Sequence, residues 1–445
     1  MNAPSRRPSR ILHYLGEVGR RYFPAAPDFP LAMDIPALSW PRDGDCALAD
    51  VALPPWAEHL GVDGGNLLVP EALAGAGEQE HRWRSTDWLS AIAWYLHGEA
   101  ERQYERRHGP VHSYSVRLTG IDPRIWQRAW VNRIALFLRA WALRESGGGG
   151  LGPAPEGRLH LSHDVDAIRK TVAIRGKRTA FHLFNAVRHA GRLRGGKAWG
   201  ALADAARFAW SSADYAGLAR ICELEKAQGL RSRIHVFAGL PGGWRNPVTW
   251  LIDPGYDIAA PASRELVDSL RVLQAEGWEI GLHPSAASYR SAAELAMQRE
   301  RLEGVLGGPV TACRQHWLMF SWADSWKAQE QAGFREDSTL GFNDRPGFRA
   351  GAALLFRPWD DRAGRALDLA VLPFVFMDSQ FYDYRPMTGS ERPLALAGWV
   401  KEVVETGGEC SCIWHSHVFG PDYGWDDGFR TLLSLLPRKA GEDGG

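Results

Sequence analysis

The chain has 445 residues, of which 45% are hydrophobic and 23% charged, and such values are typical of a globular protein. Lysine plus arginine equals aspartate plus glutamate at 52 each, so the net charge gives no support to nucleic acid as the main partner. The length allows two domains, or one large domain with an appendage, and no stretch approaches the roughly 20 apolar residues of a membrane helix.

The N-terminus and the cysteines bear on location. Residues 1–24 are rich in arginine but lack the continuous apolar segment of a secretory signal. The five cysteines are scattered and form no Cys-x-x-Cys pair, so neither a disulfide framework nor a zinc–thiolate site is indicated. We therefore expect a cytoplasmic protein.

Residues 1–145 are expected to form a helix-rich region with a mainly structural role. Asp122 and Pro123 can begin a helix, which would then carry Trp126, Trp130, Ile134, Phe137 and Trp141 on one apolar stripe. A second helix is expected to begin at Asp87. Aromatic residues at helical spacing belong to a core far more often than to a ligand groove.

Residues 146–156 are rich in glycine and proline and are expected to form a linker, followed by a second domain over residues 157–440. There the pattern changes to strands alternating with helices, and glycine follows most of the helices. This alternation predicts an α/β fold with a parallel sheet, either a barrel or a doubly wound sheet. The predicted strands are 159–162, 232–237, 278–282, 310–314, 371–373 and 410–414, and the predicted helices are 214–228, 263–276, 292–306, 324–332 and 394–406.

A basic insert, Arg169–Arg194, follows the first of these strands and interleaves eight lysines and arginines with apolar residues. A basic amphipathic helix can lie on a membrane surface, which would give a peripheral membrane contact. A solvated face over a local core is the commoner explanation, and it is the one we favour.

Candidate functional residues stand at the carboxyl ends of the predicted strands, where parallel α/β folds place their sites. Asp164 and Asp166 are two residues apart, so they point the same way while the chain is extended. Two such carboxylates can bind a metal and activate water, although an Asp-x-Asp pair can also cap a helix. His283 ends a later strand and is suited to bind a metal beside this pair.

Two further candidates follow other strands. Arg314 can orient a carboxylate, although a structural ion pair is equally expected from the spacing. His415 comes after the last strand and is suited to donate a proton.

The order of these motifs resembles that of the polysaccharide deacetylases, the NodB homology domain of carbohydrate esterase family 4. The resemblance rests on Ser-His-Asp-Val-Asp at 162–166, Glu-Ile-Gly-Leu-His at 279–283, Arg314, the segment 333–342 and His415, and covers roughly residues 159–436. It implies a distorted (β/α)7-type barrel with a divalent metal, most commonly zinc, and an N-acetylated carbohydrate as substrate. It also implies Asp164 as the base, Asp166 and His283 as metal ligands, Arg314 as the residue that orients the base, and His415 as the acid.

Two departures from the family pattern qualify these assignments. The aspartates are adjacent in the family, whereas Val165 separates them here, so the roles of base and ligand could be exchanged. The second metal histidine should lie four residues after His283, where this chain has Ala287. A catalytic zinc normally has three protein ligands, so His163 and His235 are candidates for the third.

Three functions remain open at this point. The first is metal-dependent deacetylation of an N-acetylated sugar in surface-polysaccharide or glycoconjugate biosynthesis. The second is a catalytically silent carbohydrate-binding protein of the same fold, which Ala287 favours. The third is hydrolysis of another C–N amide.

Overall fold

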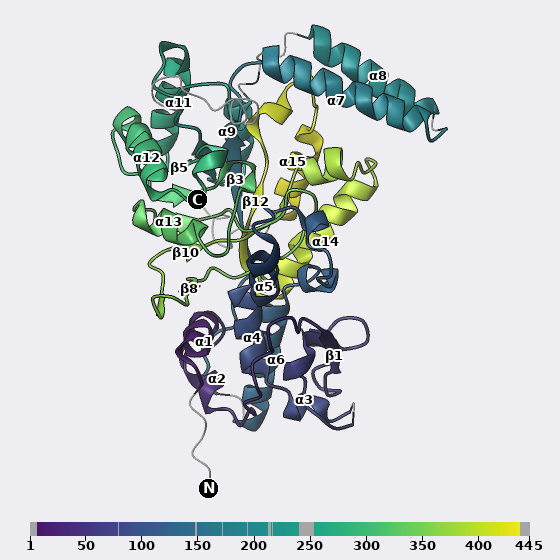
Figure 1. Cartoon of the computed structure of the whole chain (residues 1–445), viewed down its shortest axis with the longest axis vertical. Coiled ribbons are helices and arrows are strands. Elements are labelled where there is room, and N and C mark those ends of the chain that lie inside the picture. Colours follow the sequence, from purple (N-terminus) through teal and green to yellow (C-terminus); the bar gives the residue numbers. More distant parts are fainter. Residues whose placement is uncertain are drawn as a thin grey trace, which may run out of the picture.

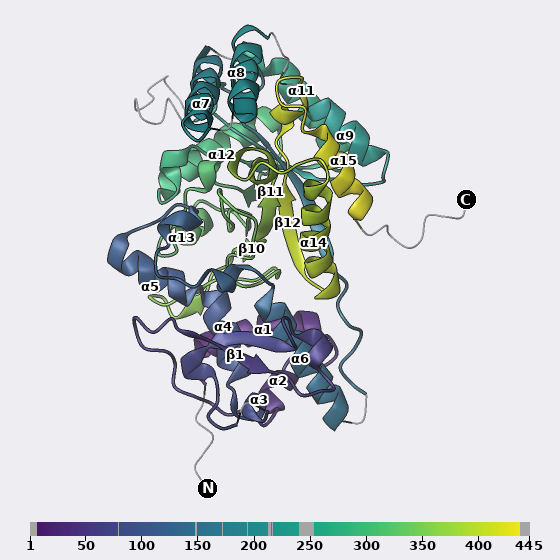
Figure 2. The ribbon, with the colours of Figure 1, turned by 90° about the vertical axis from the view of Figure 1, so that its right-hand side faces the viewer.

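The protein consists of a lobe built by the N-terminal residues, an α/β barrel, and a helical hairpin that projects from the barrel at the end far from the N-terminal lobe (Figures 1 and 2). The structure is a computed structural model, and it describes residues 7–78, 80–146, 149–170, 172–193, 195–211, 215, 217–239 and 253–436. None of the helices in this described part is long and apolar enough to cross a membrane.

The N-terminal lobe combines helices with a two-stranded antiparallel hairpin, β1–β2, that the sequence analysis did not anticipate. The predicted helix at Asp87 is confirmed, and the Asp87 side chain accepts a hydrogen bond from the Ser90 amide. The elements are α1 (Ser9–Tyr22), α2 (Phe29–Ala32), β1 (Leu48–Ala52), β2 (Asn66–Pro70), α3 (Arg82–Ser85), α4 (Trp88–His97), α5 (Glu99–His108), η4 (Pro123–Trp126) and α6 (Trp130–Glu145), with short 3-10 turns at Glu58–Leu60, Glu71–Leu73 and Ser115–Arg117.

The helix predicted from Asp122 onward is interrupted. Asp122 caps only the 3-10 turn η4, and the α-helix α6 begins at Trp130. The reason is that amides near the start of α6 bond to the barrel: Ala129 N donates to Glu402 Oε1 (3.1 Å) and Val131 N donates to Gly351 O (2.9 Å). The aromatic stripe is nevertheless buried, as predicted, and it belongs to one core that the lobe shares with the barrel.

The barrel sheet is parallel throughout, in the order β10-β7-β6-β5-β4-β3-β12-β11. Its edge strands are nearly continuous in the chain, since β10 ends at Val371 and β11 begins at Phe374. Phe374 N donates to Leu340 O, just beyond β7, while Ser411 N of β12 donates to Pro373 O. One segment therefore joins both edges, which gives the expected distorted (β/α)7-type barrel. The strands are β3 (Arg158–Val165), β4 (Arg233–Val236), β5 (Glu279–Leu282), β6 (Ala312–Cys313), β7 (Glu336–Asp337), β10 (Ala370–Val371), β11 (Phe374–Met377) and β12 (Glu409–Ile413).

The five helices predicted around the barrel are present, each within four residues of its predicted ends, and the described part of the chain adds another, Asp426–Leu435, that was not predicted. Glycines 229, 277, 307 and 333, which were expected to end helices, all have positive φ angles, a conformation that costs a glycine little. The helices are α9 (Leu218–Lys226), α11 (Arg264–Ala275), α12 (Ala292–Leu306), α13 (Ser325–Gln331), α14 (Glu391–Glu405) and α15 (Asp426–Leu435), with a small β8–β9 hairpin (Trp359–Asp360 and Arg365–Ala366).

The segments between the domains and after β3 differ from the expectation. Leu151, inside the predicted linker, is buried. The basic insert forms α7 (Val172–Ala190), which pairs with α8 (Gly195–Trp210) as the projecting hairpin (Figure 1). Phe184 and Val187, which we expected over a local core, are exposed, and the hairpin buries mainly Ala186, Ala205 and Phe208.

Candidate metal centre and active site

Because every barrel strand runs in the same direction, the carboxyl ends of the strands form one rim. Asp164 and Asp166 stand at the end of β3, and His283 directly follows β5. Arg314 and His316 follow β6, and His415 follows β12. The rim therefore gathers side chains that are up to about 250 positions apart in the chain.

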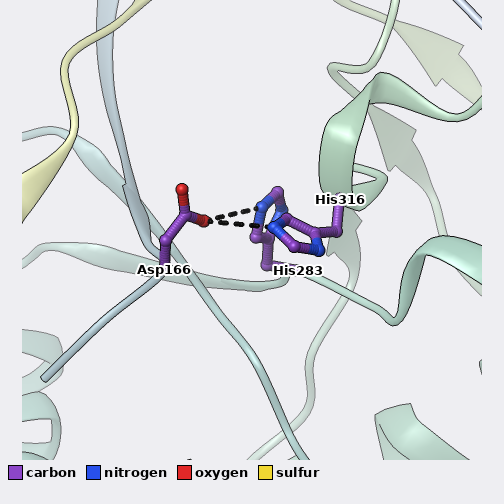
Figure 3. Close-up of side chains that lie close together, drawn as sticks. All are labelled: Asp166, His283 and His316. Atoms are coloured by element: carbon purple, nitrogen blue, oxygen red, sulfur yellow. Dashed lines mark ion pairs between the residues drawn. The ribbon is translucent and has the colours of Figure 1, made fainter. Parts of the chain in front are cut away.

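Asp166, His283 and His316 form a compact cluster at this rim (Figure 3). Asp166 Oδ1 lies 3.3 Å from His283 Nε2 and 3.7 Å from His316 Nε2. One ligand atom from each of the three residues lies within 4.8 Å of the other two. Both histidines are buried, whereas Asp166 is partly open to solvent, so the cluster has an accessible side.

Each histidine is oriented by a second contact on its other ring nitrogen. His283 Nδ1 lies 2.6 Å from the carbonyl oxygen of Arg314, so Nδ1 carries the proton and Nε2 is free to act as a ligand. His316 Nδ1 lies 3.4 Å from Asp253 Oδ1. Such partners on the far nitrogen are typical of metal-binding histidines, because they fix the tautomer and the ring plane.

The cluster fits a divalent metal on three grounds. Two ligand atoms at about 2.0–2.2 Å from a tetrahedral zinc lie about 3.3–3.6 Å apart, close to the two distances at Asp166. Asp166 Oδ1 is buried and accepts no hydrogen bond in the described structure. Two histidines and one carboxylate are also a common ligand set of catalytic zinc.

Burial acts to raise the pKa of Asp166, but the three surrounding histidines outweigh it and lower that pKa.

Asp164 lies beside this cluster in a separate buried polar group. Its Oδ1 accepts a hydrogen bond from Arg314 Nη1 at 2.9 Å and lies 3.4 Å from His235 Nδ1. Arg314 is fully buried and also donates from Nε to the Ser338 carbonyl oxygen (3.1 Å). Burial acts to raise the pKa of Asp164, but Arg314 and the nearby histidines outweigh it and hold that pKa well below its usual range.

His415 approaches Asp166 from the other side and is held by Asp378, at the end of β11. Asp378 accepts two hydrogen bonds from His415, one from Nδ1 (2.8 Å) and one from the backbone amide (2.6 Å). His415 Nε2 then lies 3.6 Å from Asp166 Oδ2. Burial acts to lower the pKa of His415, but the carboxylates of Asp378, Asp166 and Asp164 outweigh it and raise that pKa to about 10. The imidazole is therefore protonated at neutral pH and can donate a proton from Nε2.

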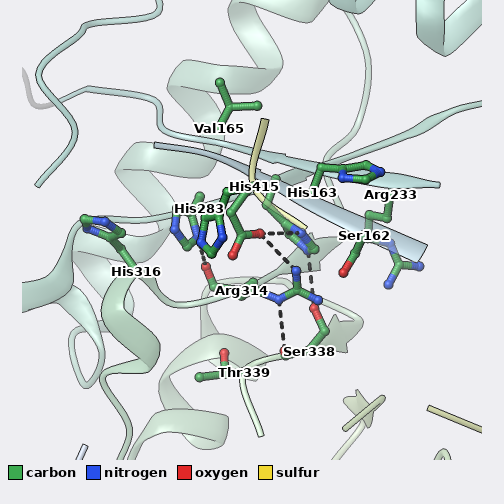
Figure 4. A network of polar contacts seen from close by, with 12 residues as sticks. Ser162, His163, Val165, Arg233, His283, Arg314, His316, Ser338, Thr339 and His415 are labelled. Carbon is green, nitrogen blue, oxygen red and sulfur yellow. Dashed lines mark hydrogen bonds and ion pairs between the residues drawn. The ribbon is translucent and has the colours of Figure 1, made fainter. Parts of the chain in front are cut away.

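The two candidates for a third metal ligand lie outside the cluster. His163 sits apart from His283, His316 and His415 (Figure 4), with its ring nitrogens 2.6 Å from the Trp414 carbonyl oxygen and 2.8 Å from Glu225 Oε1. His235 is buried between Asp164 and Ser338, and burial lowers its pKa to about 3, so it is neutral. It contacts the candidate base rather than the metal cluster.

His316 and Asp378 are the rim residues that sequence reasoning missed. Ala287 lies in the turn after β5, and the second histidine of the cluster comes instead from the segment after β6. The signal was present, because His316 stands two residues after Arg314 at the same strand end. Asp378 was hidden because the strand predicted at 371–373 continues, after a break, as the apolar run Phe374–Met377.

The turn that carries His316 is strained and is held by the N-terminal lobe. Trp317 and Leu318 have φ angles of 55° and 48°, which are unfavourable for bulky residues and persist only where surrounding contacts fix them. Ser113 Oγ donates to the Leu318 carbonyl oxygen (2.8 Å), and Asn343 Nδ2 donates to the Trp317 carbonyl oxygen (3.0 Å). Asn343 N in turn donates to Ser113 O (2.8 Å), so the lobe and the barrel together position this turn.

Comparisons with known proteins give partial likenesses. No protein-family model matches the sequence, and no curated protein matches it. Among solved structures, the chain is similar to a protein assigned as a polysaccharide deacetylase from Mycobacterium smegmatis, with 18% identity, a TM-score of 0.36, and coverage of 64% of this chain and 87% of that one. It is also similar to a polysaccharide deacetylase from Bacillus cereus, with 10% identity, a TM-score of 0.30, and coverage of 63% and 87%. Likeness at this level says nothing of chemistry, which depends on the side chains of the rim.

Proposed function

We propose that the chain is a metal-dependent hydrolase that removes the acetyl group from an N-acetylated sugar. The proposal rests on the surroundings of the Asp166 carboxylate. His283 and His316 lie near its Oδ1 atom, and His415 lies near its Oδ2 atom. A ligand set thus lies directly beside a protonated histidine. The motif order that resembles the polysaccharide deacetylases supports an acetamide as the bond cleaved.

Each residue has a role that follows from its contacts. When bound at Asp166, His283 and His316, a divalent metal, for which zinc fits the donor set, supplies a Lewis acid for the acetamide carbonyl and for water. Asp164 is ionised at neutral pH and takes a proton from the attacking water, and Arg314 fixes its orientation. Addition of the water oxygen to the carbonyl carbon forms the C–O bond first, and the C–N bond then breaks as His415 donates its Nε2 proton to the departing amine and acetate is released.

The alternative of a catalytically silent binding protein rested on Ala287. The cluster with His316 supports the enzyme instead, since three donors are available without a histidine at position 287. An acid held by Asp378 and a base held by Arg314 also have no purpose in a protein that only binds a sugar. A role in surface-polysaccharide or glycoconjugate biosynthesis and a cytoplasmic location are part of the proposal, and cell fractionation tests the latter.

The proposal is tested by measuring metal per chain together with acetate release from N-acetylated chito-oligosaccharides, after loading with zinc, cobalt or nickel. His283→Ala removes a ligand, so metal content and activity should fall together. His415→Ala should retain the metal while turnover falls about 10²–10⁴-fold, as expected for loss of a general acid.

His160→Ala is the matched control, because His160 is exposed near the opposite end of β3 and should leave both quantities unchanged. Wild-type protein that binds none of these metals and releases no acetate would eliminate the enzyme in favour of the binding protein. Metal-dependent cleavage confined to non-carbohydrate acetamides would instead favour the hydrolase of another C–N amide.

A further inference from the structure

The α7–α8 hairpin exposes an unusual amount of apolar surface for a helical pair. On α7, Phe184 is 63% exposed and Val187 is 72% exposed, while on α8 Trp199 is 75% exposed and Trp210 is 83% exposed. Scattered single exposed apolar residues are normal, but these recur at helical spacing. Trp199, Ala203, Ala206 and Trp210 follow steps of three or four and are all exposed, so they form a stripe along α8.

The hairpin is also strongly basic. Residues 169–210 contain ten lysines and arginines and one acidic residue, Asp204, whereas the whole chain is neutral. Excess acidic charge therefore lies elsewhere in the chain, and the positive charge is concentrated in this hairpin. Arg188, Arg192 and Lys197 are exposed near the connection between the two helices, beside the exposed apolar residues.

The base of the hairpin is fixed to the rim that carries the candidate site. Lys170 Nζ lies 2.7 Å from Asp422, in the segment after β12, and Arg178 Nη1 lies 2.8 Å from Asp383, in the segment after β11. Asp166 precedes Lys170 by four residues. The orientation of the hairpin is thereby coupled to the orientation of the rim.

We propose that the α7–α8 hairpin docks onto the surface of an anionic lipid bilayer. Basic charge next to exposed aliphatic side chains and tryptophans is the combination that binds such an interface: the charges attract anionic headgroups, and the apolar groups insert at the boundary with the acyl chains. Phosphate groups of nucleic acid would satisfy the arginines but would leave Phe184, Val187 and the α8 stripe in water. Because the base of the hairpin is paired with residues at the rim, docking holds the rim close to the membrane.

One consequence rests on the proposed deacetylase function. An enzyme held with its rim at a bilayer would act on an N-acetylated sugar attached to a lipid, because only such a substrate is concentrated at that surface. The docking itself does not depend on this chemistry, and it is measured separately from it.

The test is flotation of the full chain with vesicles of phosphatidylcholine containing phosphatidylglycerol, compared with vesicles of phosphatidylcholine alone. We expect binding only to the anionic vesicles. We also expect it to weaken as the ionic strength rises from about 0.1 M to 1 M, where the Debye length falls from about 10 Å to about 3 Å.

Two hairpin variants separate the contributions. Arg188→Glu with Arg192→Glu should weaken binding about 25-fold or more, since each basic residue near an anionic surface contributes roughly five-fold. Trp199→Ser with Trp210→Ser should weaken it about ten-fold or more through lost insertion. Leu394→Ser with Val272→Ser is the matched control, because both residues are exposed apolar residues on barrel helices and should leave binding unchanged.

The outcomes are distinguishable from those of the deacetylase test. Equal flotation of the wild type and both hairpin variants, or no flotation of any of them, would overturn the proposal whether or not acetate is released. Retention of a DNA duplex in place of vesicles would assign the hairpin to nucleic acid. Self-association of the wild type that both hairpin variants abolish, without flotation, would assign it to a second copy of the chain.

Discussion

Ser113 offers a direct test of whether the N-terminal lobe helps to build the metal centre. Changing Ser113→Ala removes the hydroxyl that donates to the Leu318 carbonyl and accepts from Arg349. Leu318 is buried, so its carbonyl oxygen would lose its partner at a cost of about 1–3 kcal/mol. Arg349 keeps its bonds to Glu101 and Gly341, and alanine places no more strain on the backbone at Ser113 than serine does.

The expected result has two parts. The free energy of unfolding should fall by the amount given above, measured by chemical denaturation. Zinc affinity should fall about 10–100-fold, the usual effect of losing a partner that supports metal ligands, because the strained turn at His316 is no longer fixed. Competition with a chromophoric chelator measures that affinity.

Ser115→Ala is the matched control for this experiment. Ser115 lies in the same segment, and its hydroxyl donates to Asp344 (2.9 Å) rather than to the turn that carries His316. It should lose some stability but keep the zinc affinity of the wild type. The reasoning is refuted if Ser113→Ala is destabilised and yet binds zinc as tightly as Ser115→Ala.

Three further predictions concern the base and the acid. Asp378→Asn should lower the pKa of His415. Because a general acid works only below its pKa, the high-pH limb of the activity profile should then move to lower pH. A high-pH limb that does not move would exclude His415 as the acid. Gly281→Ala would place a Cβ 2.7 Å from His235 Cδ2, so it should cost about 1–3 kcal/mol of stability and reduce turnover. Gly304→Ala, in helix α12 and with open space around its Cβ, should instead raise stability by about 0.5–1 kcal/mol and leave turnover unchanged. Asp164→Asn should retain zinc and lose turnover. It should also destabilise the fold by about 3–5 kcal/mol, since Arg314 is left buried without its charged partner. Loss of zinc in this variant would show that Asp164 is a metal ligand.

The barrel was predictable because its local signals agree. Alternating strands and helices, with glycines that adopt positive φ at the helix ends, gave most elements of the parallel sheet to within a few residues. The N-terminal lobe was less predictable, since the start of α6 is set by bonds from Ala129 and Val131 to residues that lie more than 200 positions later. Local patterns carry no information on such contacts.

The gathering of candidate residues at one rim was predictable where a residue stands at a strand end and matches a known motif, as Asp164, Asp166, His283, Arg314 and His415 do. His316 was not found because the family pattern directs attention to position 287, and only the geometry brings a residue after β6 to Asp166. The exposed face of the hairpin was not found either, since the sequence pattern of a basic amphipathic helix is the same whether its apolar residues are covered or open.

The central claim is that Asp166, His283 and His316 together bind a divalent metal. Its most direct test is a zinc titration of the metal-free wild type, His316→Ala and His160→Ala, with stoichiometry and affinity measured in each. The account predicts one tight zinc per chain in the wild type and in His160→Ala, and a large loss of affinity in His316→Ala. Zinc binding that is absent from the wild type, or unchanged in His316→Ala, would contradict it.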